Sequence, residues 1–147
     1  MRPPFATFSA LGVVLLVGCA HAASEDAGHN AAGGDLSVVG SDQDVSGGTV
    51  TASRVVADAN GWLVVHRTDA SNKPGLVVGH APLKDGVNED VTAILTEPVA
   101  PGEKLMLMLH GEEGGTETGI FEYSLGAKED GPVKVDDQLV MTVVTAQ

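Results

Sequence analysis

The pattern of apolar and polar residues changes twice along the chain, and its last part predicts strands. From Thr49 onward, runs rich in Val, Leu, Ile and Thr are separated by Gly, Pro, Asn and Asp at intervals of roughly 8 to 15 residues. This spacing is typical of an all-β sandwich or barrel. Apolar residues do not recur at helical spacing over more than about two turns there. We therefore predict an all-β fold, a single immunoglobulin-like β-sandwich of about seven strands over residues 49–147.

The apolar runs also place the individual strands and turns. Strands are predicted at 49–57, 62–66, 76–80, 91–96, 104–110, 120–125 and 139–145, with a short edge strand at 133–135. Asn60-Gly61 predicts a hairpin between the first two strands, because both residues tolerate positive φ. Pro74-Gly75 and Pro101-Gly102 each suit the centre of a type II turn. The run 104–110 is apolar on both faces, which predicts a central strand.

The N-terminal apolar run ends in Leu16-Val17-Gly18-Cys19, which has the pattern of a lipobox. The run from Phe5 to Val17 is too short for a comfortable membrane span, which needs about 20 apolar residues. We expect residues 1–18 to be a lipoprotein signal peptide and Cys19 to be the lipid attachment site, carrying an acyl chain such as palmitate. An ordinary signal peptide cleaved near residues 20–22 is the alternative.

Residues 19–48 are mostly Ala, Gly, Ser, Asp and Asn, with few large apolar side chains. Such a composition buries too little apolar surface to offset the entropy lost on ordering. We therefore predict a flexible tether between the lipidated Cys19 and the domain. The expected location is the cell envelope, held to the membrane through the Cys19 lipid. Ala20 after the cysteine resembles the outer-membrane sorting pattern if the chain comes from a Gram-negative cell.

The charge balance narrows the range of partners. The formal net charge is −12, and only one of the eight basic residues lies in the signal segment. A strongly acidic protein is repelled by nucleic acid and by anionic lipid headgroups. We expect no nucleic-acid partner, and an unknown envelope protein or surface component as the partner. Because Cys19 is the only cysteine, a disulfide within the chain is impossible.

Seven short segments, spread in order over most of residues 41–146, together resemble a known family. They are Gly-Trp-Leu-Val-Val-His at 61–66, Val-Gly-His-Ala-Pro-Leu at 78–83, Gly-Val-Asn-Glu-Asp-Val at 86–91, Glu-Pro at 97–98, Met-Leu-His at 108–110, Phe-Glu-Tyr at 121–123 and Asp-Gly-Pro-Val at 130–133. The family is an uncharacterised extracytoplasmic β domain, common in exported and surface proteins of haloarchaea and present in some bacteria. The resemblance implies a small extracytoplasmic β domain. It implies no established activity, cofactor or catalytic residue.

Histidine and methionine supply one candidate metal site. His66, His80 and His110 each end an apolar run, and Met108 shares a face of its strand with His110. Imidazole and thioether ligands together suit Cu(I). Copper is therefore the alternative cofactor, with these four residues as candidate ligands. The competing interpretation is structural, because methionine commonly fills cores. A blue-copper centre would also need a cysteine ligand, and Cys19 is assigned to the lipid.

Motifs of the common hydrolases are missing from the sequence. It has no G-x-S-x-G elbow and no H-E-x-x-H zinc motif. We predict no catalytic residues and no enzymatic activity. The predicted function is an envelope-anchored lipoprotein that presents a small β-sandwich for binding. The alternative is a periplasmic metal-binding lipoprotein that handles copper through its strand-end His and Met residues.

Overall fold

The computed structural model describes residues 35–147, which form nine β-strands and no helix. This part of the chain accordingly has no helix that could cross a membrane. The strands are β1 (Ser37–Val39), β2 (Thr49–Ala57), β3 (Gly61–Thr68), β4 (Pro74–Leu83), β5 (Gly86–Leu95), β6 (Lys104–Gly111), β7 (Lys134–Val135), β8 (Gln138–Leu139) and β9 (Met141–Thr145).

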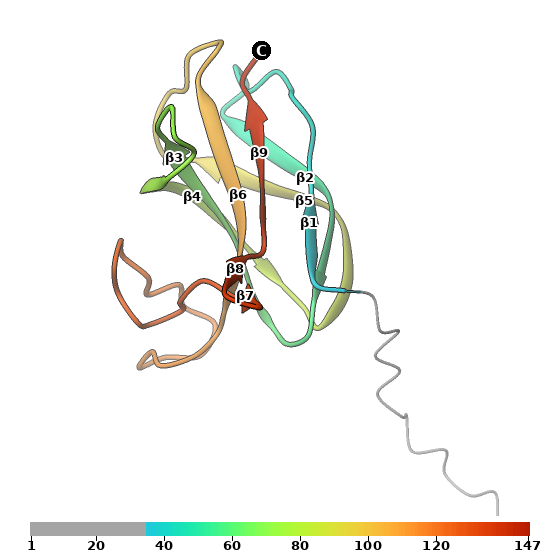
Figure 1. Ribbon diagram of the computed structural model, residues 1–147, viewed down its shortest axis with the longest axis vertical. Helices are drawn as coiled ribbons and strands as arrows, with labels where there is room; N and C mark the ends of the chain where they lie inside the picture. Colours follow the sequence, from blue (N-terminus) through green and yellow to red (C-terminus); the bar gives the residue numbers. More distant parts are fainter. Residues whose placement is uncertain (1–34) are drawn as a thin grey trace, which may run out of the picture.

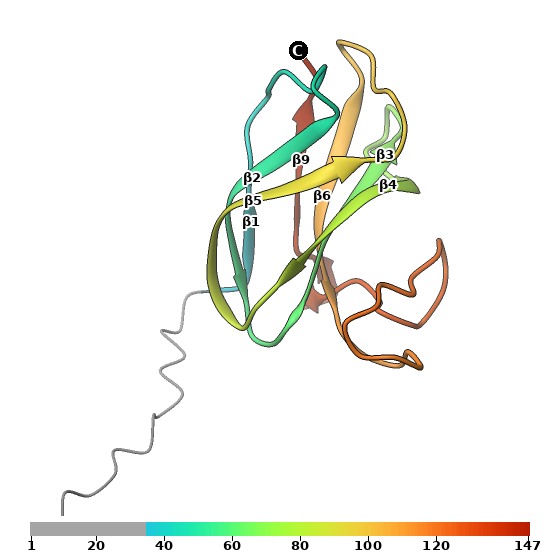
Figure 2. The same cartoon turned by 180° about the vertical axis from the view of Figure 1, so that it is seen from behind.

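The seven main strands form two facing layers (Figures 1 and 2). One layer has the order β1-β2-β5 and the other has the order β4-β3-β6-β9, and all neighbours are antiparallel. Pairing of the second strand with the fifth, and of the third with the sixth, is the arrangement of immunoglobulin-like sandwiches. The predicted all-β class and seven-stranded sandwich are confirmed.

Both edges of the two layers are joined, so the sandwich is nearly barrel-shaped. On one side β4 and β5 pair at only two positions, Gly79 with Leu95 and His80 with Ile94. These two pairs make the seven strands one continuous sheet. On the other side Gln43 forms a parallel bridge with Ala146, and its amide donates to the Thr145 carbonyl at 3.2 Å. Joining the edges in this way leaves little unpaired strand backbone to recruit another chain.

The main core lies between the layers, and a second buried layer lies on the outer face of β3 and β6. The main core alternates along β3 and β6 through Leu63, Val65, Leu105, Leu107 and Leu109. The intervening residues are buried as well, although they point the other way: Trp62, Val64, His66, Met106, Met108 and His110. The prediction of a central strand at 104–110 is therefore confirmed, because β6 lies between β3 and β9.

The folded domain begins earlier than the sequence indicated. β1 pairs with β2, and Val38 and Val45 are 8% and 4% exposed in the core. The boundary predicted at Thr49 therefore falls inside the folded part, and the tether predicted over residues 19–48 is wrong from Ser37 onward. A three-residue strand in a Gly- and Asp-rich stretch carries too weak an apolar pattern to be recognised. The signal segment, Cys19 and the rest of the predicted tether up to residue 34 lie outside the described residues.

The Asn60-Gly61 hairpin prediction is wrong, because β2 and β3 lie in different layers and do not pair. Gly61 is needed for another reason. A Cβ atom there would overlap with the carbonyl oxygen of His110 on the neighbouring strand. The side-chain oxygen of Asn60 accepts a hydrogen bond from the Asp85 amide at 3.1 Å. The dipeptide thus marks a crossing between layers and a close approach of two strands.

Two other local predictions are wrong, and one is confirmed. Pro74-Gly75 begins β4, and the turn before it is closed by the Asn72 amide donating to the Asp69 carbonyl at 3.0 Å. Residues 120–125 form no strand and belong to a long loop between β6 and β7. The turn at Pro101-Gly102 is present, with Gly102 at φ 88°.

Candidate functional site

Two histidines from different strands meet on the outer face of the second layer. His66 lies opposite Met106 and His110 lies opposite Trp62 in the register of β3 and β6. Their side chains extend toward each other, so that the two Nε2 atoms are 3.3 Å apart. By register, the ring pair spans the position occupied by Val64 and Met108. We call His66 and His110 the histidine pair.

The other ring nitrogen of each histidine faces a backbone carbonyl. Nδ1 of His66 is 2.8 Å from the Gly75 oxygen, and Nδ1 of His110 is 2.6 Å from the Asp130 oxygen. A carbonyl oxygen can only accept, so each Nδ1 must carry the hydrogen. In a neutral imidazole, Nε2 then carries no hydrogen, and its lone pair can accept one. The histidine pair therefore places two acceptors 3.3 Å apart with no hydrogen between them.

A proton shared between the two Nε2 atoms would require one ring to be positively charged, and burial disfavours that charge. His66 and His110 are 1% and 0% exposed. Burial, helped by the positive charge of a protonated His66, lowers the pKa of His110 to about 4 against the opposing effect of the Asp130 carbonyl. Burial also lowers the pKa of His66, against the opposing effect of the Gly75 carbonyl. Near pH 7 both rings are therefore neutral.

The geometry of the histidine pair suits a metal ion bound by both Nε2 atoms. Metal–imidazole bonds are about 2.0–2.1 Å long, so two nitrogens 3.3 Å apart subtend an angle of about 105–110° at the metal. That angle is close to tetrahedral. Metal-binding histidines usually donate their other N–H to a carbonyl or carboxylate, and both histidines here donate to carbonyls.

The other two predicted ligands, His80 and Met108, lie in different places. His80 is apart from the pair: its ring is exposed and stacks on Phe121 at a centroid distance of 4.4 Å. Met108 is buried and lies between the two histidines in the register. No three His, Cys, Asp or Glu side chains converge anywhere in residues 35–147. The side chains of Met106, opposite His66, and Met108 lie on the same buried face as the histidine pair.

Comparison with known protein families identifies the domain. The model of a domain of unknown function, DUF7282, matches residues 36–147. The chain belongs to the DUF7282 family. No curated protein and no solved structure matched it. The DUF7282 match begins one residue before β1 and covers the whole sandwich and the histidine pair.

Sequence reasoning missed the residues that surround the histidine pair in this DUF7282 domain. Tyr123 contacts His110 edge-on, with ring centroids 4.6 Å apart. Asp130, whose carbonyl anchors His110, is 1% exposed and adopts φ 44°. Aspartate is one of the few non-glycine residues that adopt this left-handed region readily. The only sequence signal for these roles was the Phe-Glu-Tyr and Asp-Gly-Pro-Val segments of the family resemblance.

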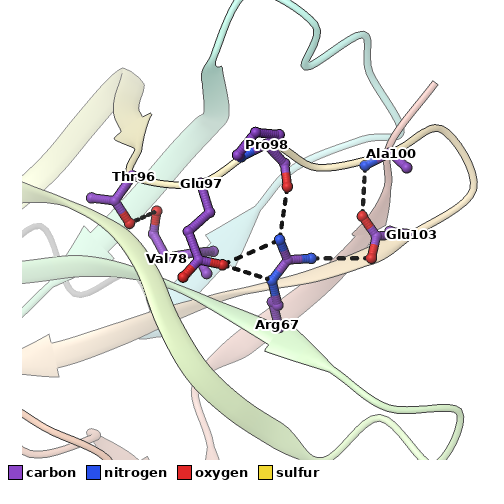
Figure 3. Close-up of polar contacts among 7 residues, drawn as sticks. All are labelled: Arg67, Val78, Thr96, Glu97, Pro98, Ala100 and Glu103. Carbon is purple, nitrogen blue, oxygen red and sulfur yellow. Dashed lines mark hydrogen bonds and ion pairs between the residues drawn. The ribbon is translucent and has the colours of Figure 1, made fainter.

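A second polar cluster of the DUF7282 domain surrounds Arg67 (Figure 3). The guanidinium donates to the carboxylates of Glu97 and Glu103 and, at 2.7 Å, to the Pro98 carbonyl. Glu103 also accepts from the Ala100 amide at 2.6 Å, and this bond, aided by Arg67, lowers the pKa of Glu103. Each polar group faces a complementary partner. The cluster fixes the loop between β5 and β6 and provides no coordination site.

Proposed function

We propose that this DUF7282 domain binds one metal ion, copper in the first instance, between the Nε2 atoms of His66 and His110. One observation carries the proposal: two buried acceptor atoms face each other at 3.3 Å, and each is oriented by a carbonyl bond on the opposite side of its ring. A metal cation accepts electron pairs and would satisfy both nitrogens at once. Metal ligation requires neutral imidazole, and the lowered pKa of each histidine supplies it.

The surrounding residues favour copper over other metals. Calcium and magnesium bind through six or more oxygen ligands, whereas the histidine pair offers nitrogen. Imidazole suits both zinc and copper, and a thioether shifts the preference toward Cu(I). Met106 and Met108 are buried thioethers on this face, and Met108 lies between the two histidines in the register. Zinc is therefore the second choice of metal.

The cellular setting of the proposed site comes from the sequence. Leu16-Val17-Gly18-Cys19 supports a lipoprotein of the cell envelope, attached to the membrane through Cys19 and exported as the family resemblance implies. In a Gram-negative cell the same signal favours the outer membrane. In this setting the domain would hold or deliver copper, and we propose no catalytic step for it. Palmitate labelling of the wild type and of Cys19→Ser tests the anchor, which fails if both label equally.

Metal titration with matched variants tests the proposed site. The chain from residue 19, with Cys19→Ser to remove the thiol, is titrated with Cu(I) against a chromogenic chelator and with Zn(II) by calorimetry. We expect one ion per chain, with affinity at least about 100-fold lower in His66→Gln and His110→Gln. His80→Gln is the matched control and should bind as the wild type does. Circular dichroism verifies that each variant is folded.

Several outcomes of this titration would contradict the proposal. Absence of copper and zinc binding by the folded protein excludes a metal site at the histidine pair. Binding that survives both His66→Gln and His110→Gln places the metal elsewhere. Loss of binding only in His80→Gln would assign the site to the exposed histidine.

A further inference from the structure

The segment that covers the histidine pair is a self-contained loop. Its ends meet where the Asp130 amide donates to the Glu113 carbonyl at 2.8 Å. Inside it, the Glu122 carboxylate accepts from the Thr116 and Glu117 amides, and the Glu122 amide donates to the Asp130 carboxylate at 2.7 Å. A compact loop with adjacent ends that is packed by its own side chains is an Ω-loop. We call residues 114–129 the Ω-loop; it is drawn in orange to red in Figures 1 and 2.

The tip of the Ω-loop touches the sandwich through aromatic rings. Among the described residues, every hydrogen bond of residues 114–127 has its partner within 112–130. Phe121 contacts His80, Trp62 and His110, with ring centroids 4.4, 5.5 and 6.4 Å apart. Tyr123 contacts His110 and His66, with ring centroids 4.6 and 5.9 Å apart. These contacts hold the tip against the sheet.

The base of the Ω-loop, in contrast, is bonded to the sheet. The Gly111 amide donates to the Gly131 carbonyl at 3.0 Å, and the Val133 amide donates to the Leu109 carbonyl at 2.9 Å. His110 Nδ1 donates to Asp130 at the same place. The tip can therefore lift while the bond that orients His110 stays intact.

The closed Ω-loop covers three polar atoms that lack complementary partners in residues 35–147. Nε1 of Trp62 is buried without an acceptor. The two Nε2 atoms of the histidine pair face each other as acceptors. Lifting the tip would let water bond to all three, which lowers the free energy of opening. A metal ion would satisfy two of the three and favour the closed state.

We infer that the Ω-loop is the gate of the histidine pair, and that Phe121 and Tyr123 are the contacts that close it. Both histidines are almost fully buried, and Tyr123 of the tip lies against both rings, so lifting the tip would open a route for a metal ion. The gate therefore sets the rates of metal uptake and release more than the equilibrium affinity. Its role toward metal rests on the proposed function, whereas the opening itself is a property of the metal-free protein.

Chemical modification of histidine measures the opening without metal. Diethyl pyrocarbonate reacts with accessible neutral imidazole, and peptide mass spectrometry separates the histidines. In the metal-free wild type we expect His80 to react readily and the histidine pair to react slowly. The double variant Phe121→Ala/Tyr123→Ala should raise the rates at His66 and His110 by at least about tenfold. Unchanged rates in the folded double variant contradict the gate.

A control pair in the same loop separates gating from general loosening. Ile120→Ala/Leu125→Ala removes two large side chains that are 51% and 53% exposed. Because they cover less of the sheet, we expect rates within about twofold of the wild type. Tyr123→Phe keeps the ring and should also behave as the wild type. An acceleration in the control equal to that in the double variant would overturn the assignment to Phe121 and Tyr123.

The wild type alone gives a second measurement that does not depend on a variant folding. If the histidine pair is exposed by local lifting, its modification rate changes by less than about twofold in low urea. If it is exposed only by global unfolding, the logarithm of the rate rises with urea along the full equilibrium slope. The second result overturns the gate even if the double variant fails to fold.

Metal release distinguishes failure of the gate from failure of the proposed site. With Cu(I) loaded, transfer to a chelator should be at least about tenfold faster in Phe121→Ala/Tyr123→Ala, with affinity within about threefold. Binding with unchanged release and unchanged modification leaves the site standing and refutes the gate. Accelerated modification in a protein that binds no metal supports the opening and refutes the metal site.

Discussion

His66 and Arg67 are neighbours on β3, yet they belong to polar clusters of opposite character. Arg67 is 30% exposed on its side chain, and its guanidinium meets two carboxylates and a carbonyl. His66 is buried, and its Nε2 meets another acceptor. A cluster that serves the fold matches donors with acceptors. The histidine pair instead leaves two buried acceptors facing each other, and the proposed cation would complete it.

The two clusters also differ in how strongly solvent weakens them. Water screens the exposed Arg67 ion pairs, so their net contribution to stability is small. Water does not reach the histidine pair, so any mismatch there costs its full desolvation penalty. Changes of pH and metal should therefore act mainly on the histidine pair.

The largest expected effect is acid destabilisation of the metal-free domain. The pKa of His110 is about 4 in the folded chain and near 6.5 when unfolded, so the unfolded chain binds the proton more tightly. Stability is therefore lost as the pH falls from 6.5, and the loss from His110 is complete near pH 4 at about 3 kcal/mol. Urea unfolding across this range measures it, with chelator present.

The comparison with Arg67 provides the control for this pH dependence. His110→Gln should lose much of the slope of stability against pH between 4 and 6.5, and Arg67→Gln should keep it. An equal slope in His110→Gln and the wild type would mean that His110 titrates alike in the folded and unfolded chains.

Metal binding should have a slightly smaller effect in the opposite direction. A ligand that binds only the folded state stabilises it by about 2.7 kcal/mol at a concentration 100 times its Kd. For a domain of this size the Tm should rise by about 10 °C. Scanning calorimetry with Cu(I) or Zn(II) should show this rise in the wild type and in Arg67→Gln. A similar rise in His66→Gln would contradict the site.

Asp130 should show an intermediate effect, because it links the histidine pair to the Ω-loop. Asp130→Ala removes the acceptor of the Glu122 amide and places alanine at φ 44°, which should cost about 2 kcal/mol. Copper affinity should fall by about tenfold as the Asp130 carbonyl shifts from His110. Asp130→Asn keeps an oxygen acceptor and tolerates the same φ, so it should recover both quantities. Failure of that rescue would exclude this positioning role.

The smallest effect is expected at Arg67. Its ion pairs are partly exposed, so Arg67→Gln should lower the free energy of unfolding by about 1 kcal/mol or less and leave metal affinity unchanged. Urea unfolding and copper titration measure the two quantities. A loss of several kcal/mol would show that this cluster, and not the buried pair, dominates the polar energetics of β3.

The long strands were predictable because each carries its own apolar pattern, whereas the three-residue β1 and the pairing partners were not. The runs at 49–57 and 104–110 match β2 and β6 closely, since alternation is a local property. Asn60-Gly61 shows where local patterns fail. The dipeptide has a local turn signal, but Gly61 is required because the backbone of His110 approaches it closely from the neighbouring strand. Phe121 and Tyr123 alternate like strand residues, yet the segment lies against an outer face.

Part of the candidate site was predictable as well, because strand ends and strand faces are local properties of the sequence. The sequence indicated that His66 and His110 end apolar strands, and that Met108 shares a face with His110. It could not show that the side chains converge, because this depends on β3 pairing with β6 in one particular register. Nor could it separate His80 from the pair. Asp130 and Gly75 act through their backbone carbonyls. Every residue has such a carbonyl, so the residue type does not reveal this role.

Nitrogen NMR of the two imidazole rings tests the central claim most directly. In the metal-free chain at pH 7, we predict that both His66 and His110 carry their hydrogen on Nδ1 and have an unprotonated Nε2. One equivalent of Cu(I) should shift both Nε2 resonances together and leave both Nδ1–H groups in place. A proton on Nε2 of either ring, with both resonances unchanged by copper and by zinc, would contradict the account: the pair would then share a proton and bind no metal.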